Sequence, residues 1–258
     1  MLNTIARAGK VLNLFTPETP EWGVTEVAAA LGLAKSTTYD LVSSLAEIGL
    51  LQRTSDDRYQ LGWRLLVMSR RLINSTSLSG QTQRAVADLA QQLNAAVTMG
   101  AWDGRRVVCI SHASSSRTGP VLAPGARLPG HASALGKLLM AQLPWARVQD
   151  RIDQYGLPAL TSGSVSDVGA FRQQLADARR NDVAVEHGET VAGHSCVAVP
   201  IYDDEYRVVA ALSISTPTER MRLRQDEFAR IARRTARNLI VQGIAPHMRE
   251  PTQRRRLI

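Results

Sequence analysis

Residues 24–41, VTEVAAALGLAKSTTYDL, decide the fold of the N-terminal part of this chain. We expect a first helix with Thr25 as its N-cap and an end at Gly32, because glycine tolerates the left-handed backbone of a helix terminus. A second helix then begins within residues 34–37 and runs to Gly49. Two short helices joined by so tight a turn form a helix-turn-helix, whose second helix offers its first residues to the DNA major groove.

The apolar residues of this stretch are spaced so that they can share one core, namely Val24, Val27, Ala28, Leu31, Leu33, Leu41 and Leu45. The first turn of the second helix is then left exposed. Its candidate DNA contacts are Lys35, Ser36, Thr37, Thr38 and Tyr39. On pattern alone, the alternative is a helical hairpin that packs against its neighbours and binds nothing.

The residues that follow predict a β-hairpin, because two short strands at residues 50–53 and 58–61 flank a polar turn. Two helices and a hairpin form a winged helix-turn-helix. An earlier helix at residues 5–15 supplies the third wall through apolar residues at helical spacing. Arg53 and Arg58 flank the wing, from which they could reach DNA phosphates.

In several separated segments and in the family's order, the chain resembles the IclR-type bacterial transcriptional regulators. The matching segments are RAGKVL at 7–12, VTEVA at 24–28, GLAKST at 32–37, YQLG at 59–62, HASALGK at 131–137, residues 186–200, and VVAALSIS at 208–215. Arg7 and Thr25 lie in these segments and complete the predicted DNA-binding set. The resemblance covers nearly the whole chain and implies a DNA-binding domain followed by a small-molecule sensor.

One position departs from the family pattern. The family usually has Arg where this chain has Asp40, on the second helix of the helix-turn-helix. An acidic side chain cannot contact a phosphate, but it can read a cytosine amino group or pair with a neighbour. The operator sequence of a relative therefore does not transfer to this chain.

Composition is that of an ordinary globular protein. A chain of 258 residues suits two domains or one large one, and its 44% of hydrophobic residues is enough for ordinary cores. It has no apolar run long enough for a membrane span, and its N-terminus lacks the apolar stretch of a signal peptide. Two cysteines are too few for a disulfide framework, so we expect a cytoplasmic protein.

The net charge of +8 invites an argument for nucleic-acid binding, but its distribution weakens that argument. Residues 1–70 contain seven Lys or Arg and seven Asp or Glu, and residues 71–219 contain thirteen of each. The whole excess lies in residues 220–258, with eleven Arg against three acidic residues. DNA affinity must therefore come from local placement on the second helix and the wing, and from a second copy of the chain.

The second half of the chain alternates between strand and helix patterns. We expect strands at 97–102, 105–111, 183–186, 195–202 and 207–215, and helices at 132–140, 144–155, 167–181 and 224–241. The Asp103-Gly104 pair is a strong hairpin signal. An antiparallel sheet surrounded by helices is an α+β domain of GAF/PAS-like type.

We therefore divide the chain into four parts. Residues 1–62 form the winged helix-turn-helix, 63–80 a linker helix, 81–243 the effector-binding domain, and 244–258 a basic tail. In the family such a linker helix joins the domains and helps pair two DNA-binding heads, whereas the alternative is a plain core helix. The tail is expected to be disordered and solvated, with DNA contact as the alternative.

The resemblance also implies an effector pocket in the second domain. Its lining residues are Leu128, Ser133, Ala134, Leu135, Glu186, Cys196, Ser213 and Ser215. Ser213 and Ser215 share one strand face, although hydroxyls that bond the local backbone are the alternative. The backbone N–H groups of residues 133–136 open a helix and could hold a carboxylate, so the implied ligand is a small organic acid, aliphatic or aromatic.

Two positions in this pocket differ from relatives that bind small keto-acids. Ala134-Leu135 replaces Gly-Ala, and Glu186 replaces Asp. Both changes add bulk and could change the choice of ligand.

Two other kinds of site were weighed. Cys196 could act as a nucleophile with His194, His131 or His187 as its base, but no oxyanion-forming motif precedes it. The segment HGETVAGHSC at 187–196 is suggestive of a metal site, yet together with His131 it has no recognised ligand spacing. A P-loop and a GxGxxG motif are both absent, so we expect neither a metal nor another cofactor, and no enzymatic activity.

The sequence therefore predicts a ligand-responsive transcriptional regulator. It would bind a (pseudo)palindromic operator as a homodimer or dimer of dimers, and a small organic acid would shift its operator affinity. The alternative is a small-molecule enzyme that uses Cys196 and carries an appended DNA-binding domain.

Overall fold

A computed structural model of the chain describes residues 3–75, 80–104, 106–115 and 121–239. The chain divides into two compact units, Met1–Asn74 and Ser75–Ile258, and each is described by itself. No helix in these ranges combines the length and the apolar character needed to cross a membrane.

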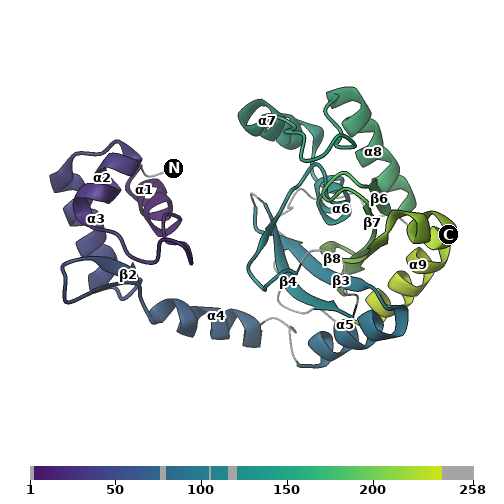
Figure 1. Cartoon of the computed structure of the whole chain (residues 1–258), viewed down its shortest axis with the longest axis horizontal. Coiled ribbons are helices and arrows are strands. Elements are labelled where there is room, and N and C mark those ends of the chain that lie inside the picture. Colours follow the sequence, from purple (N-terminus) through teal and green to yellow (C-terminus); the bar gives the residue numbers. More distant parts are fainter. Residues whose placement is uncertain (1–2, 76–79, 105, 116–120, 240–258) are drawn as a thin grey trace. The chain divides into compact units, whose positions relative to one another are not determined.

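The N-terminal unit is the winged helix-turn-helix that the sequence predicts. Its elements are α1 (Asn3–Leu12), α2 (Val24–Leu31), α3 (Lys35–Glu47), β1 (Leu51–Arg53), β2 (Tyr59–Leu61) and most of α4 (Arg64–Ser75), shown in purple and blue in Figure 1. β1 and β2 pair antiparallel, with Leu51 opposite Leu61. The core contains Val11, Phe15, Val27, Leu41, Val42, Leu45, Leu51 and Tyr59.

Two helix ends in this unit differ from the prediction. The N-cap of α2 is Gly23 rather than Thr25, because the Glu26 carboxylate accepts the Gly23 N–H at 2.9 Å and closes the first turn. α1 ends at Leu12 instead of residue 15. Phe15 is buried nonetheless, and it packs from the turn after the helix, so the apolar spacing continued beyond the helix itself.

The helix α4 lies within the predicted linker 63–80, and α5 (Gly80–Leu93) begins at its last residue. Residues 64–73 of α4 include no buried side chain, although Leu66 and Leu72 are among them. In a single chain α4 is therefore not a core helix, which was the alternative interpretation of this segment. The division into four parts stays a prediction, and its tail, 244–258, lies outside the described residues.

The C-terminal unit is built on a six-stranded antiparallel sheet with the order β5-β4-β3-β8-β7-β6. The strands are β3 (Ala96–Trp102), β4 (Val107–Ser114), β5 (Arg127–Leu128), β6 (Ala184–His187), β7 (His194–Tyr202) and β8 (Val208–Pro217). The helices are α5, α6 (Ala134–Met140), α7 (Trp145–Tyr155), α8 (Val168–Asn181) and α9 (Thr218–Asn238). The α+β class predicted from the sequence is confirmed.

The two faces of this sheet carry side chains of different size. Large residues such as Met99, Leu212 and Ile214 pack against α5 and α9 on one face. The opposite face, toward α6 and α8 in Figure 1, carries small residues such as Ala198 and Ala211. Because neighbouring residues of a strand point to opposite faces, this alternation decides which layer each helix joins. The small residues leave space between the sheet and α6.

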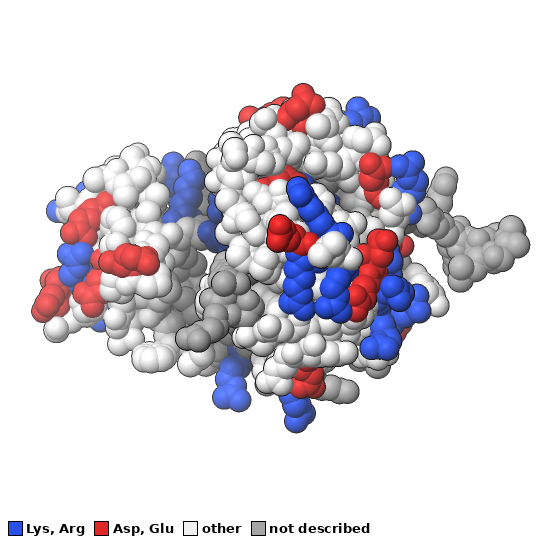
Figure 2. Space-filling view, turned by 45° about the vertical axis from the view of Figure 1, so that its right-hand side comes forward, with Lys and Arg blue, Asp and Glu red and all other residues white. Residues whose placement is uncertain are grey.

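Two elements of this unit extend beyond their predicted bounds. β4 continues to Ser114 rather than 111, and α9 begins at Thr218 rather than 224. The first turns of α9 bury only Met221, so their polar sequence concealed a helix, and the backbone at Arg224 is non-helical (φ −131°, ψ 18°). α9 has seven arginines and three acidic residues, and Figure 2 shows basic and acidic side chains interleaved on this unit.

Candidate functional site

The first turn of α3 exposes four of its five predicted DNA contacts, Lys35, Ser36, Thr37 and Tyr39. Thr38 is a correction, because its side chain is fully buried and its Oγ1 donates to the Ala34 carbonyl at 3.0 Å. A helix shows one face to solvent, and Thr38 lies on the opposite face with Leu41 and Val42. Thr38 is therefore a packing residue, not a candidate DNA contact.

Both arginines of the wing have partners within the chain. Arg53 Nη2 lies 2.9 Å from Asp57 Oδ1. Arg58 Nη2 donates to Glu26 Oε2 at 2.7 Å and to the Glu21 carbonyl at 3.1 Å, and the Arg58 hydrogen bond lowers the pKa of Glu26. Arg58 thus joins the wing to the start of α2. Contact with a phosphate, as predicted for both arginines, requires these exposed ion pairs to open.

The remaining positions of the predicted DNA-binding set lie on α1 and α2, where Arg7 is half-buried and Thr25 is exposed. Asp40, the departure from the family pattern, is exposed on α3. No cation in the described part of the chain forms an ion pair with it. Pairing with a neighbour, one of the two roles considered for Asp40, is therefore not seen within these residues.

A cavity lies between the sheet and α6 and contains about 540 Å³ of space not filled by atoms, part of it open to solvent. Its walls come from Ala96, Thr98, His112, Leu122, Leu128, Ser133, Ala134, Leu135, Glu186, Thr190, Val191, His194, Cys196, Ser213 and Ser215. All eight residues predicted to bind an effector are among them. Segments from 128 to 215 are thus brought to one cavity, and their role as ligand contacts stays a prediction.

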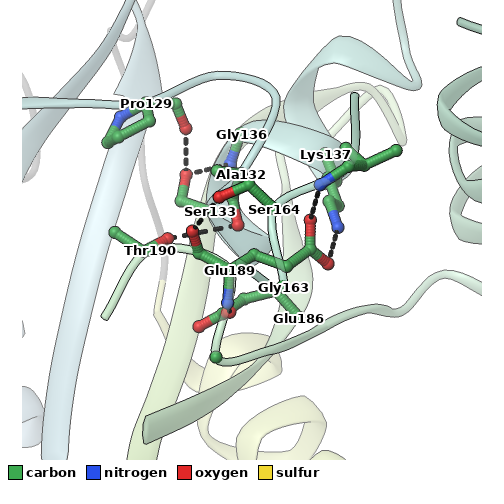
Figure 3. Close-up of polar contacts among 12 residues, drawn as sticks. Pro129, Ala132, Ser133, Gly136, Lys137, Gly163, Ser164, Glu186, Glu189 and Thr190 are labelled. Atoms are coloured by element: carbon green, nitrogen blue, oxygen red, sulfur yellow. Dashed lines mark hydrogen bonds and ion pairs between the residues drawn. The ribbon is translucent and has the colours of Figure 1, made fainter. Parts of the chain in front are cut away.

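Ser133 begins α6 at the cavity wall. It is the N-cap, its Oγ accepts the Gly136 N–H at 3.0 Å, and it donates to the Pro129 carbonyl (Figure 3). The Gly136 N–H, which the sequence suggested as a carboxylate donor, is therefore already satisfied by the cap. The N–H groups of Ala134 and Leu135 have no acceptor among the described residues.

Glu186 is almost completely buried in β6, with 1% of its surface exposed. Its Oε2 accepts the Glu189 N–H at 2.7 Å, and the Cys196 thiol on the paired strand also hydrogen-bonds to its carboxyl group. Burial raises the pKa of Glu186, because the charged form loses its hydration. The cavity therefore contains a carboxyl group whose neutral form is favoured.

The turn after β6 is fastened to α6 by a buried ion pair between Glu189 and Lys137, seen in Figure 3. Glu189 Oε2 also accepts the Val165 N–H at 3.2 Å, and Thr190 Oγ1 donates to the Ala132 carbonyl at 3.1 Å. The sequence analysis did not find this pair. A lysine in the last turn of a short helix usually indicates a solvated position.

The two serines of β8 have different partners. Ser213 Oγ donates to the Thr98 carbonyl at 3.4 Å, whereas Ser215 hydrogen-bonds with the Cys196 thiol. A bond to the neighbouring backbone was the alternative interpretation for both hydroxyls, and the structure shows it for Ser213. Both residues nevertheless line the cavity.

His112 and His194 line the cavity but were not predicted to bind an effector. His112 Nδ1 lies 2.9 Å from Thr98 Oγ1 on the neighbouring strand. Its Nε2 and both ring nitrogens of His194 are buried without a hydrogen-bond partner among the described residues. The prediction ended β4 at residue 111, so the strand alternation that directs His112 toward the cavity was not applied to it.

The geometry does not form the nucleophile that the enzyme alternative needs. His194 has no hydrogen bond to Cys196, and His131 Nε2 lies 2.9 Å from the Pro158 carbonyl. Burial raises the pKa of the Cys196 thiol well above its usual range, and the Glu186 charge raises it further. The thiolate, which is the reactive form, is therefore disfavoured. Residues suggested for a metal site do not form a group of three ligands in the part of the chain that the structure describes.

Comparison with known families decides the identity of the fold. The family model for the IclR helix-turn-helix domain matches residues 4–55, and that for the bacterial transcriptional regulator IclR C-terminal domain matches residues 70–241. The chain belongs to the IclR family. IclR-family chains of this kind are transcriptional regulators with a helix-turn-helix and a C-terminal ligand-binding domain.

Individual relatives agree with this assignment. The HTH-type transcriptional regulator XynR of Escherichia coli K12 is 30% identical over 223 residues, covering 86% of this chain and 88% of the relative. A solved IclR-type structure from Silicibacter sp. TM1040 superimposes with a TM-score of 0.81 at 24% identity, covering 96% of this chain and all of that one. An IclR homologue from Microbacterium hydrocarbonoxydans, solved in complex with 4-hydroxybenzoate, has a TM-score of 0.69 at 24% identity and covers 95% and 99%.

Proposed function

We propose that this IclR-family regulator binds a small organic acid in the cavity between α6 and the sheet, and that occupancy changes its affinity for operator DNA. The observation that carries the proposal is the convergence of Glu186, Cys196, the α6 N-cap Ser133 and two strand hydroxyls on one cavity. A volume of about 540 Å³ lies in the range of small-molecule sites.

The walls suit an acid with an apolar body. Leu122, Leu128, Leu135 and Val191 supply apolar surface, while hydroxyls, imidazoles and free amide N–H groups supply hydrogen bonds. A pocket of this mixed character fixes the orientation of a ligand through a few polar contacts. The 4-hydroxybenzoate bound by the Microbacterium homologue is an aromatic acid, which supports the same class of ligand here.

The ligand proposal is tested by thermal unfolding of the full chain with a panel of aliphatic and aromatic carboxylates. A true ligand raises the melting temperature by mass action. We expect Ser215→Phe, which fills the cavity, to abolish the shift, and Ser166→Phe, at an exposed position outside the cavity, to preserve it. An equal shift in both variants would place the ligand elsewhere.

On the DNA side, Lys35, Ser36, Thr37 and Tyr39 are proposed to contact base edges and phosphates of the operator. Lys35→Ala and Thr37→Ala should each weaken binding to upstream DNA about tenfold in gel shifts, the usual effect of losing one good contact. Lys10→Ala removes the same charge at an exposed position outside this set, and should have a smaller effect. Unchanged gel shifts for both α3 variants would show that α3 is not the recognition helix.

The proposed assembly is a homodimer or a dimer of dimers. Two linked heads bind two operator half-sites, so the affinity of each head multiplies, which a nearly neutral DNA-binding unit needs. The exposed apolar residues of α4 support this proposal, because a single chain leaves them in water.

A further inference from the structure

Two histidines face the effector cavity with unused hydrogen-bonding atoms. His112 Nε2 and both ring nitrogens of His194 are buried and have no partner among the described residues. Buried polar groups are nearly always hydrogen-bonded, because an unmade bond costs the full loss of hydration. Three such atoms in one cavity indicate that its occupant supplies their partners.

The two imidazoles lie at opposite ends of the cavity. His112 on β4 is level with Thr98 on β3, Ser213 on β8 and Ala198 on β7, whereas His194 is four residues from Ala198 along β7. Three strand spacings and four residue steps correspond to about 14 Å across and about 13 Å along a flat sheet. Two rings so placed cannot hold the same small group, so each meets a different part of the ligand.

We propose that the effector is a hydroxy acid, with its carboxylate bound by His112 and its hydroxyl bound at the other end by His194 and Glu186. This inference rests on the proposed function, since it names the ligand class and the specificity-determining residues of that cavity.

The His112 end suits the carboxylate. When the Thr98 hydroxyl donates to Nδ1 across their 2.9 Å contact, Nε2 carries the hydrogen and points a donor into the cavity. Burial lowers the pKa of His112, so its resting form is the neutral ring that this arrangement requires. The only acidic side chain on the cavity wall, within the described residues, is Glu186, which lies at the other end.

The His194 end suits a hydroxyl. Glu186 pairs with Cys196, which lies two residues from His194 on the same strand face, so the carboxyl and the imidazole are diagonal neighbours. A second carboxylate beside Glu186 would be repelled whenever Glu186 is charged. A hydroxyl both donates and accepts, so it can satisfy a neutral imidazole together with a carboxyl group in either protonation state.

The middle of the cavity is apolar. Ala96 on the sheet and Leu122, Leu128 and Leu135 opposite it leave a body of the ligand without polar partners. A short chain or a single ring between the two polar ends therefore matches the wall.

The test is calorimetric titration of the full chain with three acid pairs that differ by one hydroxyl: 4-hydroxybutyrate and butyrate, 4-hydroxybenzoate and benzoate, 4-hydroxyphenylacetate and phenylacetate. Phenol and 4-methylphenol serve as probes that lack the carboxylate. We expect at least one hydroxy acid to bind about tenfold or more tightly than its partner acid, because the unpaired His194 end rejects the partner. It should also bind more tightly than the phenols.

Variants assign the two ends. His112→Leu should reduce the affinity for the hydroxy acid to that of the corresponding phenol or alcohol, and His194→Leu should reduce it to that of the acid without a hydroxyl. His187→Leu is the matched control, since His187 is exposed on β6 and does not line the cavity. Thermal unfolding checks that each variant folds, and His112→Gln and His194→Gln replace any leucine variant that does not.

Each outcome decides a different statement. The crossed loss of carboxylate and hydroxyl selectivity supports the inference, and a reversed pattern overturns the assigned orientation. Acids that bind equally with and without the hydroxyl overturn the inference but preserve the proposed function. If no carboxylate binds at all, the proposed function fails together with it.

Discussion

Lys137 is a fully buried cation in a short helix, and its counter-charge comes from a turn 52 residues away in sequence. Such a pair contributes little net stability, because both charges lose their hydration, but breaking it leaves one charge buried alone. We expect Lys137→Met to lower the free energy of unfolding by about 3–5 kcal/mol, measured by urea denaturation. The double variant Lys137→Met with Glu189→Gln should recover part of this loss, and the absence of any recovery would contradict the buried pair.

The buried carboxyl of Glu186 makes stability depend on pH. Because its pKa is raised in the folded chain, its contribution is complete below its unfolded pKa and is lost as the pH rises through its folded pKa. Glu186→Gln should therefore flatten the decline in melting temperature as the pH rises above the ordinary carboxyl value of 4.5. Asp204→Asn, in an exposed turn, is the control. A variant whose decline matches that of the unmodified chain would show that Glu186 does not titrate in this range.

At the scale of single residues, the resemblance placed all eight predicted effector residues on the cavity wall, but it did not find His112, His194 or Lys137. The roles of these three depend on which strand face or turn lies opposite them. Thr38 shows the same limit, because a position one residue along a helix decides between solvent and core.

At the scale of elements, α4 leaves large apolar side chains in water, including Trp63 just before it (75% exposed), Leu66 (56%) and Leu72 (60%). An apolar stripe of this size on a helix is typical of an interface. We expect Leu72→Glu to raise the dissociation constant of the dimer about tenfold or more, measured by sedimentation. Arg71→Glu, one residue away and exposed, controls for the added charge. Equal effects of the two changes would contradict packing through α4.

Most elements were predictable because their sequences carry a clear period. The apolar spacing of 24–45 and the hairpin after it correspond closely to α2, α3, β1 and β2. Ends were less predictable, as in α1 and α9, because Phe15 packs from outside a helix and the first turns of α9 bury only Met221. Packing across the fold, which a local pattern does not contain, decides both cases.

At the scale of the whole molecule, the proposed function requires free-energy coupling between the cavity and the operator. Linkage makes this coupling reciprocal, so an acid that changes operator affinity by a given factor must have its own affinity changed by the same factor when DNA is present. We expect a factor between about 5 and 150, measured by titrating the acid with and without operator. Equal affinities would show that cavity and DNA are uncoupled. Ser215→Phe should leave DNA binding without the acid unchanged.

By itself, the sequence determined the winged helix-turn-helix, the α+β class and the family, because periodicity, turn residues and separated motifs are local and survive without knowledge of contacts. Only the tertiary structure decided that residues from 96 to 215 share one cavity, that Glu189 pairs with Lys137, and that two imidazoles are left without partners. The physical reason is that burial and hydrogen-bond satisfaction depend on which strands pair and which faces meet. Those contacts join residues that are more than a hundred positions apart, such as Thr98 and Ser213.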